Sequence, residues 1–282
     1  MKVTAIRFDS DNYAYWVHKI GGSIGVLIDA GSVNEILSFF KSNGLPGPLH
    51  IFTTHKHFDH CGANGHVKMP ETKIYAGDIE AITVPGCTEH MKDGDSVIID
   101  GMTITAIHSP CHTKGHVLYL FKVNDSPNNP IGTIKENKDA NGHWVEYVDG
   151  INRALFTGDT IFAGGCGRFF EGNGGDMLKV MDNVETFPED LYVFCGHEYS
   201  FDNATFGLMV EPENPAMQEF MAKAKAAKEK GTFLMPPTLK EEKTYNVFMR
   251  CRTKEIQEKL KCTDPVECMN KLREAKNNKK WP

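Results

Sequence analysis

Short apolar segments bounded by turn residues dominate the first two thirds of the chain. Their length and their β-branched and aromatic content predict nine strands, at residues 14–17, 25–29, 50–54, 73–75, 96–99, 103–108, 117–123, 154–157 and 191–195. Helical spacing of apolar residues is sparser there and predicts helices over 33–42 and 176–186. Because strands and helices interleave, the pattern indicates an α/β or mixed-sheet arrangement.

The pattern changes to helices after about residue 200. Asn214 and Pro215 predict the start of one helix, and Gly231 predicts its end. Two further helix starts are predicted by capping boxes, at Thr238 with Glu241 and at Asp264 with Glu267. We therefore predict a first domain at 1–198, with a polar surface insertion at about 124–153, and a helical domain at 199–282.

Composition narrows the classes of function. The 282 residues are 40% hydrophobic with a net charge of −6, which gives no general attraction to nucleic acid or to anionic membranes. No run approaches the roughly 18 apolar residues of a membrane span, and no signal or transit peptide is recognisable, so we expect a cytoplasmic location. On that basis we expect the eight cysteines to be reduced. Without a C-x-x-C pair, a structural zinc finger is not expected.

The densest candidate chemistry directly follows the apolar run at 49–52. His55, His57, Asp59 and His60 supply four potential metal ligands within six residues. His55 and His57 can converge on one ion, whereas Asp59 and His60 can face a second. Imidazole and carboxylate together favour zinc, iron or manganese over calcium or magnesium. The alternative is a polar surface loop that happens to carry histidines.

Further candidates follow other predicted strands. His112, Asp159 and His197 each lie just beyond an apolar segment, so all could lie along one edge of a sheet. Taken singly, each histidine could be an ordinary hydrogen-bonded residue, and Gly-Asp is a common turn. Together with the first cluster, they favour a two-metal site.

These residues carry a resemblance to a known family. Thr-His-x-His-x-Asp-His at 54–60, His112, Phe-Thr-Gly-Asp at 156–159 and Cys-Gly-His-Glu-Tyr at 195–199 resemble the metallo-β-lactamase superfamily. Within it, the segment at 195–199 and the helical tail resemble the glyoxalase II (hydroxyacylglutathione hydrolase) family, over nearly the whole chain. The resemblance implies an α+β fold, a four-layer αβ/βα sandwich that is the catalytic domain at 1–198 and a C-terminal all-helical domain at 199–282 that binds the substrate.

The resemblance also implies a ligand set and a reaction. His55, His57 and His112 would bind one metal, Asp59, His60 and His197 the other, and Asp159 would bridge them. Zn²⁺ is the first expectation for both ions, with iron or manganese as alternatives. Asp59 and Asp159 would be catalytic, because a metal-bridging hydroxide oriented by Asp59 would attack the thioester carbonyl. The implied activity is hydrolysis of S-(2-hydroxyacyl)glutathione, such as S-lactoylglutathione, to D-lactate and glutathione, the second step of methylglyoxal detoxification.

The implied substrate contacts both match and depart from the family. Arg273 and Lys276 are three residues apart on the last predicted helix and could hold a carboxylate of glutathione, although a solvated basic face is the alternative. Tyr199 matches the tyrosine that the family has beside its last metal-binding histidine. In the segment Arg168, Phe169 and Phe170, the family usually has Lys and Tyr at the first and third positions. The missing hydroxyl at Phe170 leaves another thiol carrier open.

Several competing functions remain at this stage. One is a mononuclear iron persulfide dioxygenase of the same superfamily, and another is a thioesterase for a different thiol carrier. A β-lactamase is disfavoured by the helical tail. A non-enzymatic alternative is a catalytically silent binding or regulatory protein, which would not require intact metal ligands. We expect a monomer that acts on a small-molecule glutathione thioester, without nucleic-acid or membrane partners.

Overall fold

The computed structural model describes residues 1–123, 133–135, 144–148, 151–232, 234 and 236–279. The chain forms two compact units. The first comprises residues 1–108 and 115–158, and the second comprises residues 109–114 and 159–282. The domain boundary between residues 198 and 199 stays a prediction.

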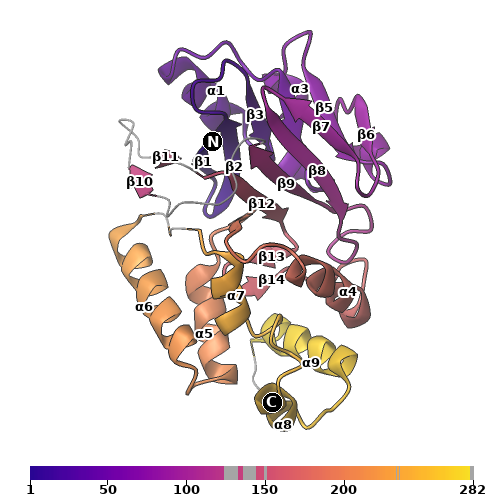
Figure 1. Ribbon diagram of the computed structural model, residues 1–282, viewed down its shortest axis with the longest axis vertical. Helices are drawn as coiled ribbons and strands as arrows, with labels where there is room; N and C mark the ends of the chain where they lie inside the picture. Colours follow the sequence, from indigo (N-terminus) through magenta and orange to yellow (C-terminus); the bar gives the residue numbers. More distant parts are fainter. Residues whose placement is uncertain (124–132, 136–143, 149–150, 233, 235, 280–282) are drawn as a thin grey trace. The chain divides into compact units, whose positions relative to one another are not determined.

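The first unit contains an eight-stranded sheet in the order β10-β11-β1-β2-β3-β4-β5-β6 (Figure 1). Its strands are β1 (Lys2–Phe8), β2 (Asn12–His18), β3 (Gly25–Ile28), β4 (His50–Phe52), β5 (Lys73–Gly77), β6 (Glu89–Met91), β10 (Thr133–Lys135) and β11 (Trp144–Val148). Consecutive strands from β3 to β6 are parallel, with Ile28, Phe52 and Tyr75 in register. The residues that follow these strands therefore leave the sheet at one edge.

A second sheet completes the first unit. Within this unit its order is β12 (Arg153–Gly158), β9 (Val117–Val123), β8 (Met102–His108) and β7 (Ser96–Ile99), all antiparallel. Phe52 of the first sheet packs edge-to-face on Tyr119 of β9, with ring centroids 5.0 Å apart. Aromatic side chains thus fill the space between the two sheets, as in other sheet-on-sheet packings.

Helices of the first unit cover the first sheet. They are α1 (Val33–Ser42), α2 (Phe58–Cys61), α3 (Asn64–Val67) and the 3-10 turn η1 (Ala81–Thr83). The apolar face of α1 buries Phe39 and Phe40, and the Phe40 ring lies 4.9 Å from that of Trp16 on β2. This core is the continuous apolar cluster that fixes β4, and with it the loop that carries the first four candidate ligands.

The second unit is mainly helical (Figure 1). Its elements are β13 (Ile161–Phe162), β14 (Gly165–Cys166), α4 (Gly174–Glu185), β15 (Tyr192–Cys195), α5 (Ser200–Val210), α6 (Pro215–Lys230), α7 (Leu239–Tyr245), α8 (Lys254–Leu260) and α9 (Pro265–Asn277). Helix α6 is capped by Asn214 and ends at Gly231 in the left-handed conformation, as the sequence predicts.

The local predictions hold with two corrections. Thr238 and Glu241 form the predicted capping box. At the start of α9, Asp264 accepts from Val266 N, but Glu267 pairs with Lys271 Nζ, so the second box is wrong in its glutamate half. The expectation that all cysteines are reduced is also wrong, because Cys262 and Cys268 form a disulfide.

The predicted insertion at 124–153 lies largely outside the described residues. Of this stretch the structure describes β10, β11 and residues 151–153. Strand β11 pairs antiparallel with both β10 and β1. These two strands, together with β1, β6, β13 and β14, are missing from the strands predicted by the apolar pattern.

Candidate metal centre

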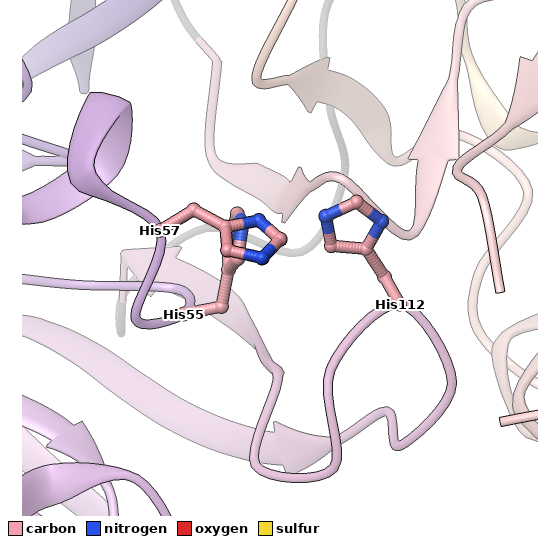
Figure 2. A group of neighbouring side chains, drawn as sticks. All are labelled: His55, His57 and His112. Carbon is pink, nitrogen blue, oxygen red and sulfur yellow. The ribbon is translucent and has the colours of Figure 1, made fainter. Parts of the chain in front are cut away.

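Four potential ligands of the first unit lie on the loop and short helix that follow β4. His55 is fully buried and its Nε2 lies 2.9 Å from His57 Nδ1. His60 is also buried, and its Nε2 lies 3.5 Å from Asp59 Oδ2. The two predicted pairs also lie against each other, since the ring centroids of His55 and His60 are 4.2 Å apart. Figure 2 shows the imidazole rings of His55 and His57 rising from this loop.

A buried aspartate that the sequence pattern did not single out orients this loop. Asp29 follows β3, adopts a left-handed backbone with φ of 54°, and is 2% exposed. Its carboxylate accepts from Thr54 N and Thr54 Oγ1, both at 2.8 Å, and lies 2.9 Å from His60 Nδ1. Since Nδ1 of His60 is held in this way, Nε2 is left to face a metal, which is the usual arrangement behind metal-binding histidines.

Other contacts hold the remaining side chains of the loop. Asn12 Nδ2 donates to Asp59 Oδ2 at 2.9 Å. The buried Glu80 accepts from Lys56 N at 3.0 Å and from Gly115 N at 3.1 Å. Thr54 Oγ1 lies 3.1 Å from His55 Nδ1. The ligand-bearing segment is thus braced at each end, which preorganises its side chains.

The glycine that precedes Asp159 is required by its surroundings. Gly158 has φ of 46°, and a Cβ there would lie 2.5 Å from Thr54 Oγ1 and 2.8 Å from His116 Nε2. His116 is buried and stacks on His55, with ring centroids 4.8 Å apart. The structure therefore places His116 as a support for the candidate ligand His55.

The second unit holds three candidate ligands, two histidines and one aspartate. His112 lies on the loop after β8 (Figure 2), Asp159 follows β12, and His197 follows β15. Asp159 Oδ2 lies 3.4 Å from His112 Nε2, and Asp159 Oδ1 lies 3.4 Å from His197 Nε2. Each oxygen of the aspartate thus faces a different histidine.

Backbone and aromatic groups fix these two histidines. His112 Nδ1 lies 3.0 Å from Arg168 O, which directs its Nε2 toward Asp159. His197 stacks on Tyr199 with ring centroids 4.9 Å apart and an interplanar angle of 2°. Phe162 and Tyr199 pack in a T-shaped arrangement with ring centroids 5.1 Å apart.

The donor spacing in each unit fits a metal. Ligands held about 2.1 Å from a tetrahedral ion stand about 3.4 Å from one another. The pairs Asp159–His112, Asp159–His197 and Asp59–His60 have this spacing, which is long for a hydrogen bond. Among the described residues, seven histidine and aspartate side chains are grouped so that they could hold a metal ion. They are the seven predicted from sequence: His55, His57, Asp59, His60, His112, Asp159 and His197. Such a set suits a divalent ion such as zinc, iron or manganese.

A cavity of about 640 Å³ opens beside His112 and Asp159 in the second unit. Aromatic residues line it near these ligands, namely Phe162, Phe170 and Tyr199. Four cationic side chains also line it: Arg168, Arg273, Lys276 and Lys279. Its volume falls within the range of small-molecule sites.

Five of the six residues that the sequence predicts as substrate contacts line this cavity. Arg168, Phe170, Tyr199, Arg273 and Lys276 line this cavity, whereas Phe169 is not among its lining residues. Phe170 is 59% exposed and its ring lies 5.1 Å from that of His112. Phe170 therefore presents an apolar surface close to a candidate ligand.

Arg273 and Lys276 are not a solvated basic face. Arg273 is 6% exposed and donates through Nη1 to Cys166 O at 2.7 Å. This bond ties α9 to the cavity wall, a role that the sequence did not predict. Lys276 is half-buried, and burial lowers its pKa to about 7, with a further lowering from the charge of Arg273.

A second buried acid supports the wall from behind. Glu242 accepts from Gly164 N at 3.0 Å, from Tyr245 Oη at 2.8 Å and from Asn246 Nδ2 at 2.7 Å. Burial raises the pKa of Glu242 to about 7, while these three donors oppose the rise. Glu242 thereby fixes the turn between β13 and β14. Cys166 at the end of β14 and Arg168 beyond it line the cavity. Cys61, which directly follows the candidate ligand His60, is a buried thiol whose pKa burial raises to about 12.

Two family models match the sequence. The model described as hydroxyacylglutathione hydrolase C-terminus matches residues 198–279, and the metallo-beta-lactamase superfamily model matches residues 8–73. The cytoplasmic hydroxyacylglutathione hydrolase of Arabidopsis thaliana is 33% identical over 281 residues, covering 98% of each chain. The chain belongs to the hydroxyacylglutathione hydrolase family. A hydroxyacylglutathione hydrolase of Gloeothece citriformis is 31% identical and covers 99% of this chain and 100% of the relative.

Solved structures confirm the predicted fold class. ETHE1 from Myxococcus xanthus matches with a TM-score of 0.60 and 20% identity, covering 99% of this chain and 92% of that one. A metallo-beta-lactamase from Staphylococcus aureus matches with a TM-score of 0.59 and 15% identity, covering 98% and 73%. At these identities the likeness shows the metallo-β-lactamase fold. Like others of its family, the chain is a hydrolytic enzyme. Each described helix is too short or too polar to span a bilayer.

Proposed function

We propose that this hydroxyacylglutathione hydrolase cleaves S-(2-hydroxyacyl)glutathione thioesters, such as S-lactoylglutathione, to the hydroxy acid and glutathione. The observation that carries the proposal is the Asp159 carboxylate, whose two oxygens each lie 3.4 Å from a different histidine Nε2. Such an aspartate suits a bridge between two ions. The cavity beside it has the size and the positive charge that an anionic thiol carrier needs.

The seven side chains divide into two ligand sets in this proposal. His55, His57 and His112 would hold one divalent ion, and Asp59, His60 and His197 would hold the other, with Asp159 available to both. Zinc is proposed for both, since imidazole and carboxylate donors suit it, with iron or manganese as alternatives. When bound, the ions supply a nucleophile at neutral pH and polarise the thioester carbonyl.

The side chains of the protein do the remaining work. Asn12 Nδ2 holds Asp59 Oδ2, so Asp59 can orient the attacking oxygen as well as act as a ligand. The glutathione thiol has a pKa of about 8.5, so it leaves as a thiolate without a strong acid donor. Among the described residues, the mechanism needs neither a serine nor a cysteine nucleophile, in line with the raised pKa of Cys61.

The cavity of the second unit is the proposed site for glutathione. Arg168, Lys276 and Arg273 would attract its carboxylates, and Tyr199 would contact its peptide part. Arg273 already bonds the backbone at Cys166, so it also shapes the wall. Phe170 and the neighbouring Phe169 are proposed to contact the thioester end, where Phe170 lies near His112.

Substrate affinity should depend on the charge of Lys276. Its pKa is lowered to about 7, so the ammonium is present below that pH and is lost above it. A bound carboxylate favours the ammonium, and KM should therefore rise roughly fivefold between about pH 6 and pH 8. The measurement is KM for S-lactoylglutathione across this range in wild type and in Lys276→Met. The variant should show a high KM that hardly changes with pH; an unchanged wild-type profile in Lys276→Met would assign the titration to another group.

The thiol carrier is tested by comparing thioesters. The same lactoyl group is offered on glutathione, on coenzyme A and on N-acetylcysteamine to metal-loaded protein. We expect kcat/KM for glutathione to exceed the others by at least about tenfold, because of the three carriers glutathione alone offers carboxylates to the cationic side chains of the cavity. A higher kcat/KM for another carrier would show that the missing hydroxyl at Phe170 marks a changed substrate.

We also infer that the enzyme acts in the cytoplasm as a monomer, on a small molecule, without nucleic-acid or membrane partners. The location is supported by the Arabidopsis relative named as cytoplasmic. The net charge of −6 supports the absence of nucleic-acid binding.

A further inference from the structure

Charged side chains of both signs line the cavity. Arg168, Arg273, Lys276 and Lys279 line it, and none of them forms an ion pair with a carboxylate of the described residues. Apart from the ligand Asp159, the acid lining this cavity is Asp202. Asp202 also forms no ion pair within the described part of the chain. Unpaired charges of both signs in one cavity indicate a ligand that itself carries both signs.

Asp202 lies at the cationic part of this cavity. It is an exposed residue in the first turn of α5, and α5 also supplies Phe206 and Met209 to the lining. Its charge acts on Lys276, where it favours the ammonium and opposes the effect of burial on the pKa. Lys276 Nζ in turn lies 5.9 Å from the centre of the Phe206 ring. An acid and a base therefore face the same space without closing into a pair.

Glutathione matches this arrangement. Its γ-glutamyl residue carries an ammonium and a carboxylate on the same carbon, and its glycine carries a second carboxylate. We propose that Asp202 binds the α-ammonium of the γ-glutamyl residue, while the surrounding cations take the carboxylates. This inference rests on the proposed function, and it adds a residue that selects for the amino group of the thiol carrier.

The main alternatives for Asp202 act on every ligand equally. An acid in the first turn of a helix stabilises that helix, and a charge near Lys276 keeps the lysine protonated. Neither role distinguishes a ligand with the amino group from one without it. The test is therefore the difference between two ligands, compared across variants.

The experiment uses metal-loaded protein with S-methylglutathione and its desamino analogue, in which hydrogen replaces the α-amino group. Dissociation constants are measured by calorimetry for wild type, Asp202→Asn, Asp202→Glu and the control Glu255→Gln, which removes an exposed acid from the first turn of α8. We expect loss of the amino group to weaken binding about threefold in wild type, Asp202→Glu and Glu255→Gln. In Asp202→Asn the two ligands should bind equally.

Two outcomes would overturn the inference. One is an equal loss of binding for the desamino analogue in wild type and Asp202→Asn, and the other is no preference in wild type. Hydrolysis of S-lactoylglutathione is followed in the same samples. Absence of turnover together with retained amino-group selectivity would defeat the proposed reaction and keep the binding role, whereas turnover without selectivity would do the reverse.

Discussion

Replacing Asp159 with Ala should abolish turnover of S-lactoylglutathione, with a loss of at least about a thousandfold in kcat. Its two oxygens face His112 and His197, each at 3.4 Å, so one substitution removes a ligand from both proposed ions. The protein should accordingly lose the two-metal occupancy, as counted by inductively coupled plasma mass spectrometry. Asp159→Asn should behave similarly, because the amide keeps the volume but removes the negative charge.

Asp182→Ala is the matched control for this substitution. It removes an exposed aspartate of the same unit, whose carboxylate pairs with Arg252 on the surface. Metal content and turnover should stay at wild-type values there, because an exposed ion pair contributes little to stability. Full activity in Asp159→Ala would show that the bridging role is wrong.

Asp29→Asn should lower metal affinity by about tenfold to a hundredfold although Asp29 binds no ion itself. The carboxylate accepts from Thr54 N and Thr54 Oγ1 and holds His60 Nδ1. An amide presents an N–H to one of these donors, so His60 loses its fixed orientation. The measurement is a competition titration of zinc against a chelator, with turnover restored at saturating zinc to a large extent.

Asp100→Asn is a close control for this effect. Asp100 also has a left-handed backbone, with φ of 48°, and accepts from Ser23 N and Ile24 N. It differs from Asp29 in contacting none of the candidate ligands. Zinc affinity should be unchanged in Asp100→Asn, and an equal fall in both variants would point to a general loss of stability rather than to His60.

The candidate ligands could be singled out from sequence because the segments that carry them follow apolar strands. His55, His112 and His197 lie within four residues of the ends of strands β4, β8 and β15, and loops at strand ends collect functional residues. The helical tail could likewise be predicted, because its prolines and a glycine mark where helices begin and end. The matching family model at 198–279 covers the same stretch.

Other features depend on contacts that sequence spacing does not encode. From the sequence, Asp29 is expected to be an ordinary turn residue. The parallel pairing of β3 with β4 brings it beside Thr54 and His60, which its carboxylate contacts. From the sequence, Arg273 is expected to be a surface base on a lysine-rich helix. In the structure it is buried, and it donates to Cys166 O, 107 residues away in the chain. Asp202 gains its setting from Lys276 on a different helix. Long-range packing decides each of these cases.

The proposed two-metal thioesterase is tested most directly by reconstituting metal-free protein with zinc and following hydrolysis of S-lactoylglutathione. The rate should increase with added zinc until two ions per chain are bound, with glutathione and lactate formed in equal amounts. Full activity at one ion per chain, or no hydrolysis at two, would contradict the proposal.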